Sequence, residues 1–439
     1  MSGASSAGAC ASMAGTERAI SLIDGNSFYC SCERLFRPDL KDTPIIVLSN
    51  NDGAVVSLTP EAKALGFKMG TPYFQIRDEL ERKGVAVFSS NYVLYGDISD
   101  RMMATIETMS DSVSPYSIDE AFADLTGMPE PLEEYGRAIR DKVMRWTGIP
   151  VGVGIGPTKT LAKLANWAAK KWRDKTGCVV DLRDTNRQEK LLKVVEVDTI
   201  WGVGSRLKVK LNAAGIRTGW DLATHDSAAI RRIGGVVLER TALELRGIPC
   251  LSLEDIAPVR QMIAKGQSFG VRIHEVGPLQ EAVGSYITRA AEKLRAQGSV
   301  CGALRVSIRT GMFNPNERHY SNAMVMQFTR PTDDTRELLA AGRDAVAALY
   351  EPGYAYAKAE ILLMDLSDRG VKTGDLFAPA PREHSEELMS VMDAINRRMG
   401  RGTVRPAVVP GRVKWAMAQN MKSPEYTTNL DELWQIPTG

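Results

Sequence analysis

The segment AISLIDGNSFY, residues 19–29, carries the pattern on which the fold depends. Its first six residues are mostly apolar and end in an acid, which predicts a buried strand that brings Asp24 to the edge of a sheet. A second segment, SIDEAF at 117–122, predicts the bend of a hairpin that carries Asp119 and Glu120. Together the two segments predict three carboxylates at one end of a sheet.

Three carboxylates that converge would repel one another unless a divalent cation neutralised them. Oxygen ligands favour Mg²⁺, which also binds substrate phosphates. Two such ions about 3.5–4 Å apart can activate an attacking hydroxyl and stabilise a leaving pyrophosphate. The alternative that these acids are solvated turn residues stays open at this point, although both motifs lie within apolar strands.

The composition is that of a globular protein of about three domains. The chain has 439 residues, of which 44% are hydrophobic and 25% are charged. Its 55 Lys and Arg against 53 Asp and Glu exclude a wholly basic, histone-like protein and confine any nucleic-acid surface to part of the chain. Scattered cysteines without a CxxC pair, and only four histidines, argue against a disulfide framework and a zinc site. The chain has no apolar run of membrane-spanning length and no signal-peptide pattern, so we expect a cytoplasmic protein with residues 1–18 as a disordered extension.

The pattern that follows predicts a mixed α/β domain. TPIIVLSNNDGAVVSL at 43–58 predicts two short strands around an Asn-Asn-Asp-Gly turn. VGVGIG at 151–156 predicts a strand whose glycines leave one face bare, so that the next helix, at about 158–172, can lie close against it. Further helices are predicted at 60–65, 93–110 and 133–147, and the hairpin at 114–125.

Three lysines share one face of the predicted helix 158–172. Lys159, Lys163 and Lys170 fall within about 40° of one another around the helix, and Asn166 lies on the same face. A solvated cationic face is the ordinary interpretation of a lysine-rich helix, and a phosphate-binding face is the alternative.

The sequence pattern changes near residue 185. Residues 194–245 are predicted to be helical with glycine-centred turns, and a polar connector follows at about 251–262. From 267 to 365 the order strand, helix, two strands, helix, strand predicts an α+β module. Residues 257–330 hold ten Lys or Arg against four acids, so cationic charge is concentrated there. The remainder, rich in Pro, Gly and Met with weak periodicity, is expected to be a peripheral tail.

Several motifs together identify a family. DGNSFYCSCE, SNNDGAVVS, EAKALGFKMG, YSIDEAF and GIGPTKTLAKLANWAAKK resemble the Y-family translesion DNA polymerases, and they are most similar to the UmuC type, the catalytic subunit of bacterial DNA polymerase V. The resemblance runs from about residue 19 to the C-terminus. It implies a right-hand polymerase of palm, small fingers and helical thumb, plus an α+β little finger. The implied boundaries are palm 19–42 and 86–184, fingers 43–85, thumb 185–250, linker 251–262, little finger 263–366 and tail 367–439.

The resemblance also implies roles for individual residues around the three carboxylates. Asp24, Asp119 and Glu120 match the catalytic metal ligands, with the backbone carbonyl of Gly25 as a further ligand, and Tyr29 matches the steric gate that excludes a 2′-hydroxyl. A buried structural role for Tyr29 is the competing interpretation, and Phe28 beside it is expected to pack in the core. The implied nucleotide-binding residues are Phe28, Ser57, Lys63 and Lys170, and the implied roof over the nascent base pair is Gly53 and Ala54.

The chain departs from the family pattern in the fingers. Pro60 stands where many relatives have a phosphate-contacting tyrosine, and Lys63 replaces an arginine, which lowers the expected nucleotide affinity because lysine lacks the bidentate fork. At Gly53, a tight turn that needs a positive φ is the competing interpretation.

Two regions are expected to hold DNA. IWGVGSRLKVKLNAAGIRTGWDL, residues 200–222, has the form of a helix-hairpin-helix, in which a Gly-x-Gly turn can offer backbone N–H groups to a phosphate. A plain helical turn is the alternative. The basic 257–330 region would give salt-sensitive, sequence-independent binding. The candidate DNA-binding residues are Gly202, Gly204, Arg206, Lys208, Arg260, Lys265, Arg272, Arg305 and Arg309.

The implied function is error-prone synthesis opposite damaged template by two-Mg²⁺ catalysis in an SOS-type response, with primer-template DNA and deoxynucleotides as substrates. The resemblance adds a cleaved UmuD-type dimer and a RecA filament as partners, and nucleoid association during activity. TGDLF at 373–377 occupies the place of a sliding-clamp peptide, with Leu376 and Phe377 as anchors but Thr373 in place of the usual Gln. Two alternatives remain: a catalytically idle DNA-binding subunit that modulates replication or recombination, and another two-metal phosphoryl-transfer enzyme such as a nucleotide cyclase.

Overall fold

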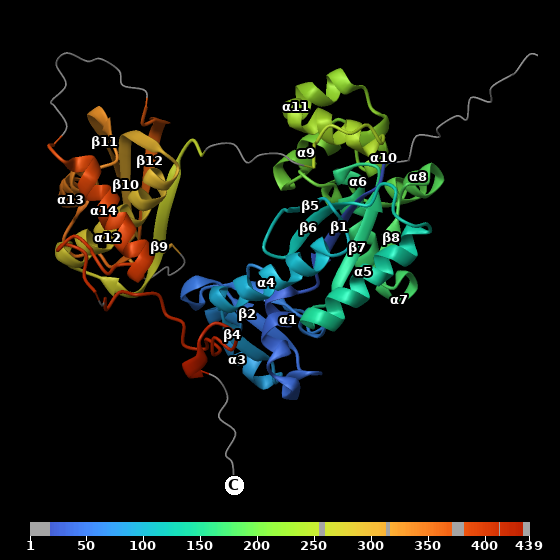
Figure 1. The fold of residues 1–439 in the computed structure, drawn as a ribbon, viewed down its shortest axis with the longest axis horizontal. Helices are drawn as coiled ribbons and strands as arrows, with labels where there is room; N and C mark the ends of the chain where they lie inside the picture. Colours follow the sequence, from blue (N-terminus) through green and yellow to red (C-terminus); the bar gives the residue numbers. More distant parts are fainter. Residues whose placement is uncertain (1–17, 254–259, 313–316, 371–381, 412, 433–439) are drawn as a thin grey trace, which may run out of the picture. The chain divides into compact units, whose positions relative to one another are not determined.

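The computed structural model describes residues 18–253, 260–312, 317–370, 382–411 and 413–432. These residues form two compact units, which are described separately (Figure 1). Unit 1 comprises the chain up to residue 48, residues 54–256 and residues from 421 onward, and unit 2 comprises 49–53 and 257–420. In the described part of the chain, no helix is both long and apolar enough to cross a membrane.

A five-stranded sheet forms the centre of unit 1, in the order β5-β6-β1-β7-β8. The central strand β1 runs antiparallel to both β6 and β7, while β8 runs parallel to β7. The strand predicted from AISLID and the predicted hairpin are both confirmed. The strands are β1 (Ile20–Gly25), β5 (Val113–Pro115), β6 (Glu120–Asp124), β7 (Val151–Gly156) and β8 (Val179–Asp181).

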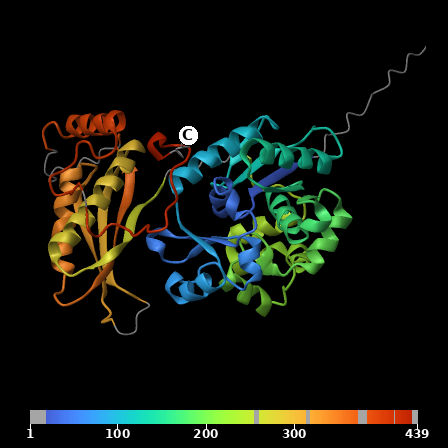
Figure 2. The same ribbon diagram turned by 90° about the horizontal axis from the view of Figure 1, so that it is seen from below.

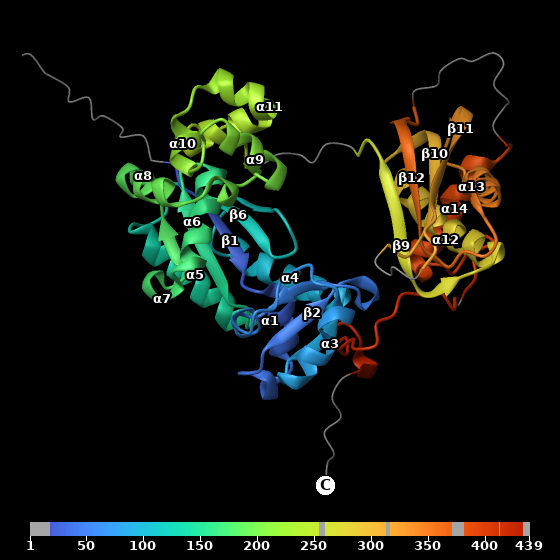
Figure 3. The same cartoon turned by 180° about the vertical axis from the view of Figure 1, so that it is seen from behind.

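Helices cover both faces of this sheet because the side chains of β1 alternate. Ile23 lies in a core cluster with residues of α4 and α5, whereas Leu22 lies in a cluster with Phe122 and Ala162 of α6. Figure 3 shows α6 beside β1 and β6. The helices of this part are α1 (Phe28–Leu35), α4 (Tyr92–Glu107), α5 (Leu132–Thr147), α6 (Lys159–Lys171) and α7 (Arg173–Thr176), and a 3-10 turn spans Pro38–Leu40.

The predicted close approach of a helix to the glycine strand is confirmed. A Cβ atom added to Gly154 would lie 2.1 Å from the backbone N of Asn166 and 2.3 Å from the carbonyl O of Ala162. Because only hydrogen fits at this position, the backbones of β7 and α6 can meet directly. This contact fixes the height at which α6 presents its lysines along the sheet.

A second, three-stranded sheet in unit 1 has the order β3-β2-β4. The two strands predicted around the Asn-Asn-Asp-Gly turn are confirmed, but the parallel partner of β2 was not predicted. Its elements are β2 (Ile45–Leu48), the turn η2 (Asn50–Asp52), β3 (Val55–Leu58), α2 (Pro60–Ala64), α3 (Tyr73–Arg82) and β4 (Ala86–Ser89).

Short helices complete unit 1 beyond β8, as predicted. They pack around a core that includes Leu191, Leu211 and Leu245. The longest is interrupted at Gly235, whose φ is 75°. The elements are α8 (Thr185–Val194), η3 (Val197–Thr199), α9 (Ser205–Ala213), α10 (Gly219–Thr224) and α11 (Ser227–Leu245).

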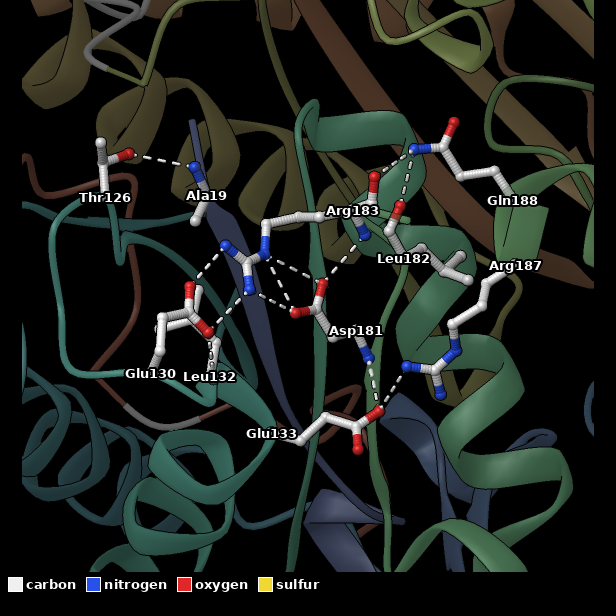
Figure 4. A network of polar contacts seen from close by, with 10 residues as sticks. All are labelled: Ala19, Thr126, Glu130, Leu132, Glu133, Asp181, Leu182, Arg183, Arg187 and Gln188. Atoms are coloured by element: carbon white, nitrogen blue, oxygen red, sulfur yellow. Dashed lines mark hydrogen bonds and ion pairs between the residues drawn. The ribbon is translucent and has the colours of Figure 1, made fainter. Parts of the chain in front are cut away.

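A polar network joins these helices to the sheet (Figure 4). Arg183 forms ion pairs with Asp181 at 2.8 Å and with Glu130 at 2.7 Å. Arg187 of α8 pairs with Glu133 of α5 at 2.9 Å. The guanidinium of Arg183 thus ties the end of β8 to the start of α5 just before α8 begins.

Unit 2 is a four-stranded antiparallel sheet in the order β11-β10-β12-β9, with helices along one face (Figures 2 and 3). The predicted order of strands and helices is confirmed. On β10, Leu304, Val306 and Ile308 point into the core shared with α12 and α13. The elements are β9 (Ile263–Ile273), α12 (Val276–Ala296), β10 (Ser299–Thr310), β11 (Ser321–Thr332), α13 (Thr335–Leu349) and β12 (Tyr356–Asp368).

The expectation of a peripheral, weakly structured tail was wrong for much of the region after residue 366. Residues Ser385–Met399 form the helix α14, and Trp415 is buried in the core of unit 2. Tyr426 is buried in the main core of unit 1. Widely spaced single apolar residues anchor this region, and such a pattern has no helical or strand period.

Candidate active site

Two of the predicted carboxylates face each other across neighbouring strands. Asp24 on β1 is the direct cross-strand partner of Glu120 on β6, so both side chains leave the same face of the sheet. Asp119 precedes Glu120, and its carbonyl accepts a hydrogen bond of 2.8 Å from the backbone N–H of Gly25. The structure therefore brings the three acids together at the end of β1.

Lysines of α6 neutralise this acidic cluster. Lys163 lies 2.9 and 3.0 Å from the two carboxylate oxygens of Glu120, and Lys170 forms an ion pair with Asp24. Asn166 donates hydrogen bonds to the carbonyl groups of Leu22 and Gly152, which fixes α6 on the sheet. Of the three lysines predicted to share this face, Lys163 and Lys170 thus meet the carboxylates, whereas the ammonium of Lys159 lies over the ring of Phe122 at 5.0 Å.

The pKa of Asp24 is raised from 3.8 to about 6, mainly by burial; Lys170 opposes this rise, and the charges of Glu120 and Asp119 contribute to it. Close carboxylates in a partly dry site favour a bound cation, since a cation relieves their repulsion. Among the residues that the structure describes, however, no group of three or more His, Cys, Asp or Glu is arranged as a metal site. In this structure Lys170 and Lys163 occupy carboxylate oxygens of Asp24 and Glu120.

The hydroxyl of Ser117 shapes the turn that carries Asp119. It donates to the Asp119 carboxylate at 2.6 Å and accepts from the backbone N–H groups of Asp119 and Glu120 at 3.3 and 3.1 Å. This turn chemistry was not recognised in the sequence, although a serine two residues before an aspartate is an ordinary signal for it.

Tyr29 lies near the acids in a nest of aromatic rings. It stacks on Tyr95 at a centroid distance of 4.6 Å, with Tyr92 edge-on at 5.9 Å. The ring is half-buried, and burial raises the pKa of its hydroxyl to about 12, so the phenol stays protonated. Phe28 is only 3% exposed. This burial agrees with the expectation that Phe28 packs in the core. A side chain so little exposed has almost no surface with which to contact a nucleotide.

The expected nucleotide residues of the small sheet do not meet the acids as Lys170 does. Ser57 is buried and accepts a hydrogen bond of 3.3 Å from the thiol of Cys30, while Lys63 is exposed on α2. Gly53 is exposed with a φ of −80°, and Ala54 beside it is half-buried. The interpretation that Gly53 supplies a positive φ was wrong, because Asn51 and Asp52 adopt the positive values at this turn.

Comparison with known proteins places the chain in a family. Protein UmuC of Salmonella typhimurium is 46% identical over 418 residues, which cover 94% of this chain and 99% of that protein. This chain belongs to the UmuC type of Y-family DNA polymerases. The impB/mucB/samB family model matches residues 23–167, and the model of its C-terminal domain matches residues 260–376. A domain of unknown function, DUF4113, matches residues 386–436.

Other relatives and a solved structure agree with the family and the fold. Protein ImpB of Salmonella typhimurium is 46% identical over 94% of this chain and 98% of its own length, and DNA polymerase IV 2 of Bacillus subtilis is 29% identical over 88% of this chain and 92% of its own length. A solved Y-family DNA polymerase chimera superposes with a TM-score of 0.64 at 20% identity, over 80% of this chain and 99% of its own. The predicted fold class, a right-hand polymerase with α/β and α+β parts, is confirmed.

In this UmuC-type polymerase, the expected helix-hairpin-helix opens with two exposed glycines. Gly202 has a φ of 88°, and Gly204 immediately precedes α9. Arg206 is exposed, but Lys208 pairs with Glu196 at 2.8 Å and Asp198 at 2.7 Å. The turn itself and Arg206 are therefore the more accessible parts of the motif.

The exposed face of the unit 2 sheet gathers basic side chains. Arg305 and Arg309 of β10, together with Lys358 of β12, line one depression on this face. Sequence reasoning missed Lys358, which stands opposite Arg309 in the strand pairing. Its signal was the alternation of apolar and polar residues along β12, which places Lys358 and Glu360 on the solvent side.

The other predicted DNA-binding residues of unit 2 lie in differing surroundings. Burial lowers the pKa of Lys265, and Arg272 pairs with Glu317 at 3.2 Å. Arg260 is exposed, and its carbonyl accepts a hydrogen bond of 3.0 Å from Gln297. The possible clamp peptide, with Thr373, Leu376 and Phe377, lies outside the described residues.

Proposed function

We propose that this chain adds deoxynucleotides to a primer 3′-hydroxyl opposite damaged template, with two Mg²⁺ ions held by Asp24, Asp119, Glu120 and the carbonyl of Gly25. Translesion DNA synthesis is the activity of its family. The observation that carries the assignment of residues is the cross-strand pair of Asp24 and Glu120 with Asp119 beside it. The raised pKa of Asp24 supports it, since such a carboxyl benefits from a nearby cation.

Bound Mg²⁺ would assist deprotonation of the primer hydroxyl and neutralise charge on the leaving pyrophosphate. Lys170 and Lys163 neutralise the carboxylates in the free protein and become available to the triphosphate when the acids take up their ligands. No protein nucleophile is needed, because the primer hydroxyl itself attacks the α-phosphorus and the protein positions the reactants.

Residues around this centre select and hold the nucleotide in the proposal. The half-buried ring of Tyr29 excludes a 2′-hydroxyl. Ser57 and Lys63 complete the phosphate contacts, and Gly53 and Ala54 leave a spacious roof that tolerates distorted template bases. The exposure of Lys63 on α2 leaves its ammonium accessible to a phosphate. Ser57 is buried and bonded to Cys30, so its hydroxyl has to leave Cys30 to contact the nucleotide.

The DNA-binding surfaces and the division into domains belong to the same proposal. We assign the palm, fingers, thumb, linker and little finger to the ranges expected from the sequence, except that β4 goes with the fingers because it pairs with β2 in the small sheet. The thumb turn at Gly202 and Gly204 with Arg206 holds a phosphate, and the basic face with Arg305 and Arg309 holds the duplex backbone. A cleaved UmuD-type dimer, a RecA filament, the sliding clamp and nucleoid association during an SOS response complete the proposed setting.

The carboxylate assignment is tested by Asp119→Ala. We expect Mg²⁺-dependent primer extension to fall by about a hundredfold or more, while the affinity for primer-template DNA is unchanged. Asp111→Ala is the matched control, because Asp111 is an exposed acid just before β5. Primer extension and fluorescence anisotropy with the same DNA measure the two properties. Wild-type extension by the Asp119 variant would refute the proposed site.

The sugar-gate assignment is tested by Tyr29→Ala. Removing the ring opens space beside the sugar, so ribonucleotide insertion is expected to rise by about tenfold or more relative to deoxynucleotide insertion. Single-nucleotide insertion kinetics with matched ribo- and deoxyribonucleotides measure the ratio. An unchanged ratio would remove Tyr29 from this role.

A further inference from the structure

The segment Met421–Tyr426 is built into unit 1. The backbone of Met421 exchanges two hydrogen bonds of 3.0 Å with Ser89, at the end of β4. The ring of Tyr426 stacks on Phe36 at 4.6 Å with an interplanar angle of 12°, and it is only 8% exposed. This C-terminal segment is therefore part of the core that surrounds α1 and α4.

At the middle of the segment, Ser423 enters a fully buried polar site. Asn91, at the N-terminus of α4, donates hydrogen bonds to the carbonyl of Ser423 at 3.0 Å, to its hydroxyl at 3.0 Å and to the carbonyl of Pro424 at 3.2 Å. The Ser423 hydroxyl donates in turn to Glu33 of α1 at 3.1 Å. Asn91 and Glu33 are both 0% exposed, so these contacts are protected from water.

Glu33 connects this polar site to the aromatic ring beneath the proposed sugar gate. The hydroxyl of Tyr95 donates to the same oxygen of Glu33 at 2.5 Å, and the ring of Tyr95 stacks on Tyr29 with an interplanar angle of 17°. Tyr29 and Glu33 are four residues apart on α1, so they share one helix face. Tyr95 is thus held at its hydroxyl by Glu33 while its face supports Tyr29.

We propose that the C-terminal segment sets the position of Tyr29, through Ser423, Glu33 and Tyr95, and so contributes to the sugar selectivity of this polymerase. The inference rests on the proposed gate role of Tyr29. The three linking side chains are positioning residues, because none of them touches the reacting atoms.

The physical reason lies in how few donors hold Glu33. Within the described residues, its second carboxylate oxygen is buried without a hydrogen-bond partner. Losing the Ser423 hydroxyl would leave Tyr95 as the remaining side-chain donor, and a buried carboxylate reorients when its hydrogen bonds are lost. Tyr95 must follow, since its hydroxyl is bound to Glu33, and the stacked ring of Tyr29 shifts with it. A filter that rejects one hydroxyl group is sensitive to such small shifts.

Ser423→Ala in the full-length chain tests the proposal, with Ser423→Thr as the variant that keeps the hydroxyl. Lys422→Ala is the matched control, because Lys422 is the preceding, exposed residue and pairs with Glu425 on the outside. Glu33→Gln, which keeps the volume of the side chain, supplies a second route to the same weakening. Insertion kinetics give the ratio of ribonucleotide to deoxynucleotide efficiency for each variant, alone and combined with Tyr29→Ala.

We expect Ser423→Ala and Glu33→Gln to raise this ratio by about fivefold, while Ser423→Thr and Lys422→Ala leave it within about twofold of the wild type. In the Tyr29→Ala background, Ser423→Ala should add nothing, because the ring that it positions is gone. An equal loss of both insertion efficiencies with an unchanged ratio would show a merely structural role and overturn the inference. If Tyr29→Ala itself left the ratio unchanged, the gate assignment would fail and the inference with it.

Discussion

Asp24 and Lys170 form an ion pair in which each partner has a second proposed task. The aspartate is to bind Mg²⁺ and the lysine is to bind the triphosphate. Pairing keeps the free protein from holding unneutralised charges in a partly buried place, which would be costly. The same logic applies to Lys163 and Glu120. The lysine face of α6 therefore stabilises the site before any substrate arrives.

Lys170→Ala is expected to raise the KM for each deoxynucleotide by about tenfold or more, because a hydrogen bond from a charged donor contributes about 1.5–3 kcal/mol. Steady-state primer extension measures this KM. Lys171→Ala serves as the control, since the ammonium of Lys171 lies over the ring of Trp167 at 4.5 Å. Similar KM values for the two variants would contradict a specific phosphate contact at Lys170.

Glu33 gives a prediction about stability and pH. Burial raises its pKa from 4.5 to about 7, although hydrogen bonds from Tyr95 and Ser423 oppose the rise. Because the folded protein binds this proton more tightly than the unfolded chain, the stabilisation is complete below about pH 4.5 and is lost as the pH rises through about 7. The full loss amounts to about 3 kcal/mol.

Glu33→Gln should remove this dependence. The variant is expected to become more stable relative to the wild type between about pH 5 and about pH 8, because its amide never ionises. Urea unfolding of both proteins across this range measures the difference. Parallel stability curves for the two proteins would show that Glu33 does not titrate as its burial indicates.

Single residues also show what the sequence could reveal at this scale. The convergence of Asp24 with Asp119 and Glu120 could be expected, because an acid at the end of a buried strand and acids at a hairpin bend can meet at one edge of a sheet, but the direct pairing of Asp24 with Glu120 comes from the register of the strands. The burial of Ser57 beside Cys30 could not, since it depends on how α1 packs against β3. Positive φ values at Asn51 and Asp52 rather than Gly53 were open from the sequence, because asparagine, aspartate and glycine all tolerate the left-handed region and the local turn decides among them.

At the scale of elements, the contact between β7 and α6 determines where the lysines of α6 lie relative to the sheet. Gly154→Ala is expected to destabilise the protein by about 3 kcal/mol or more, because the new Cβ would overlap backbone atoms that cannot move aside. Gly96→Ala is the control, since Gly96 lies within α4 with no atom within 4 Å of the added Cβ. This change should stabilise by about 0.5–1 kcal/mol through helix propensity. Thermal unfolding of both variants decides between these signs.

The elements of both sheets were largely predictable because their periods are regular. The glycines of VGVGIG predicted the close contact of this strand with a helix. The order of strands and helices in unit 2 was predicted from the alternation of apolar residues and from helical spacing. The parallel pairing of β2 with β4 was missed, since the partners Ile45 and Ala86 are separated by two helices. Pairing between distant strands is decided by the packing of the elements between them.

At the scale of the whole molecule, binding to DNA should depend on salt through the basic face of unit 2. Replacing both Arg305 and Arg309 by Ala is expected to lower the slope of log affinity against log salt by about 1.8, because two phosphate contacts are lost. Arg343→Ala is the control, since Arg343 is exposed on α13, which packs on the other face of the sheet. Binding titrations at several salt concentrations give the slopes. A slope unchanged in the double variant would exclude this face as the docking surface.

The region after residue 366 shows the limit of prediction from sequence at this scale. Ser423 and Tyr426 are buried through their contacts with Glu33 and Phe36, which lie hundreds of residues earlier in the chain. A single serine and a single tyrosine among proline and polar residues show no helical or strand periodicity, so the sequence does not predict that they are buried.

The place of Ser423 in the core of unit 1 bears on how the protein is made. Ser423 follows Glu33 by 390 residues, so at about 5–20 residues per second a ribosome needs on the order of 20–80 s to deliver the hydroxyl that the carboxylate awaits. Until then Glu33 lacks the hydrogen bond from Ser423, and Phe36 lacks the ring of Tyr426. A premature stop codon or a protease cut after residue 420 would leave the acidic residues in place but remove the ring and the hydroxyl that cover Phe36 and Glu33, and so expose the defective product to quality control.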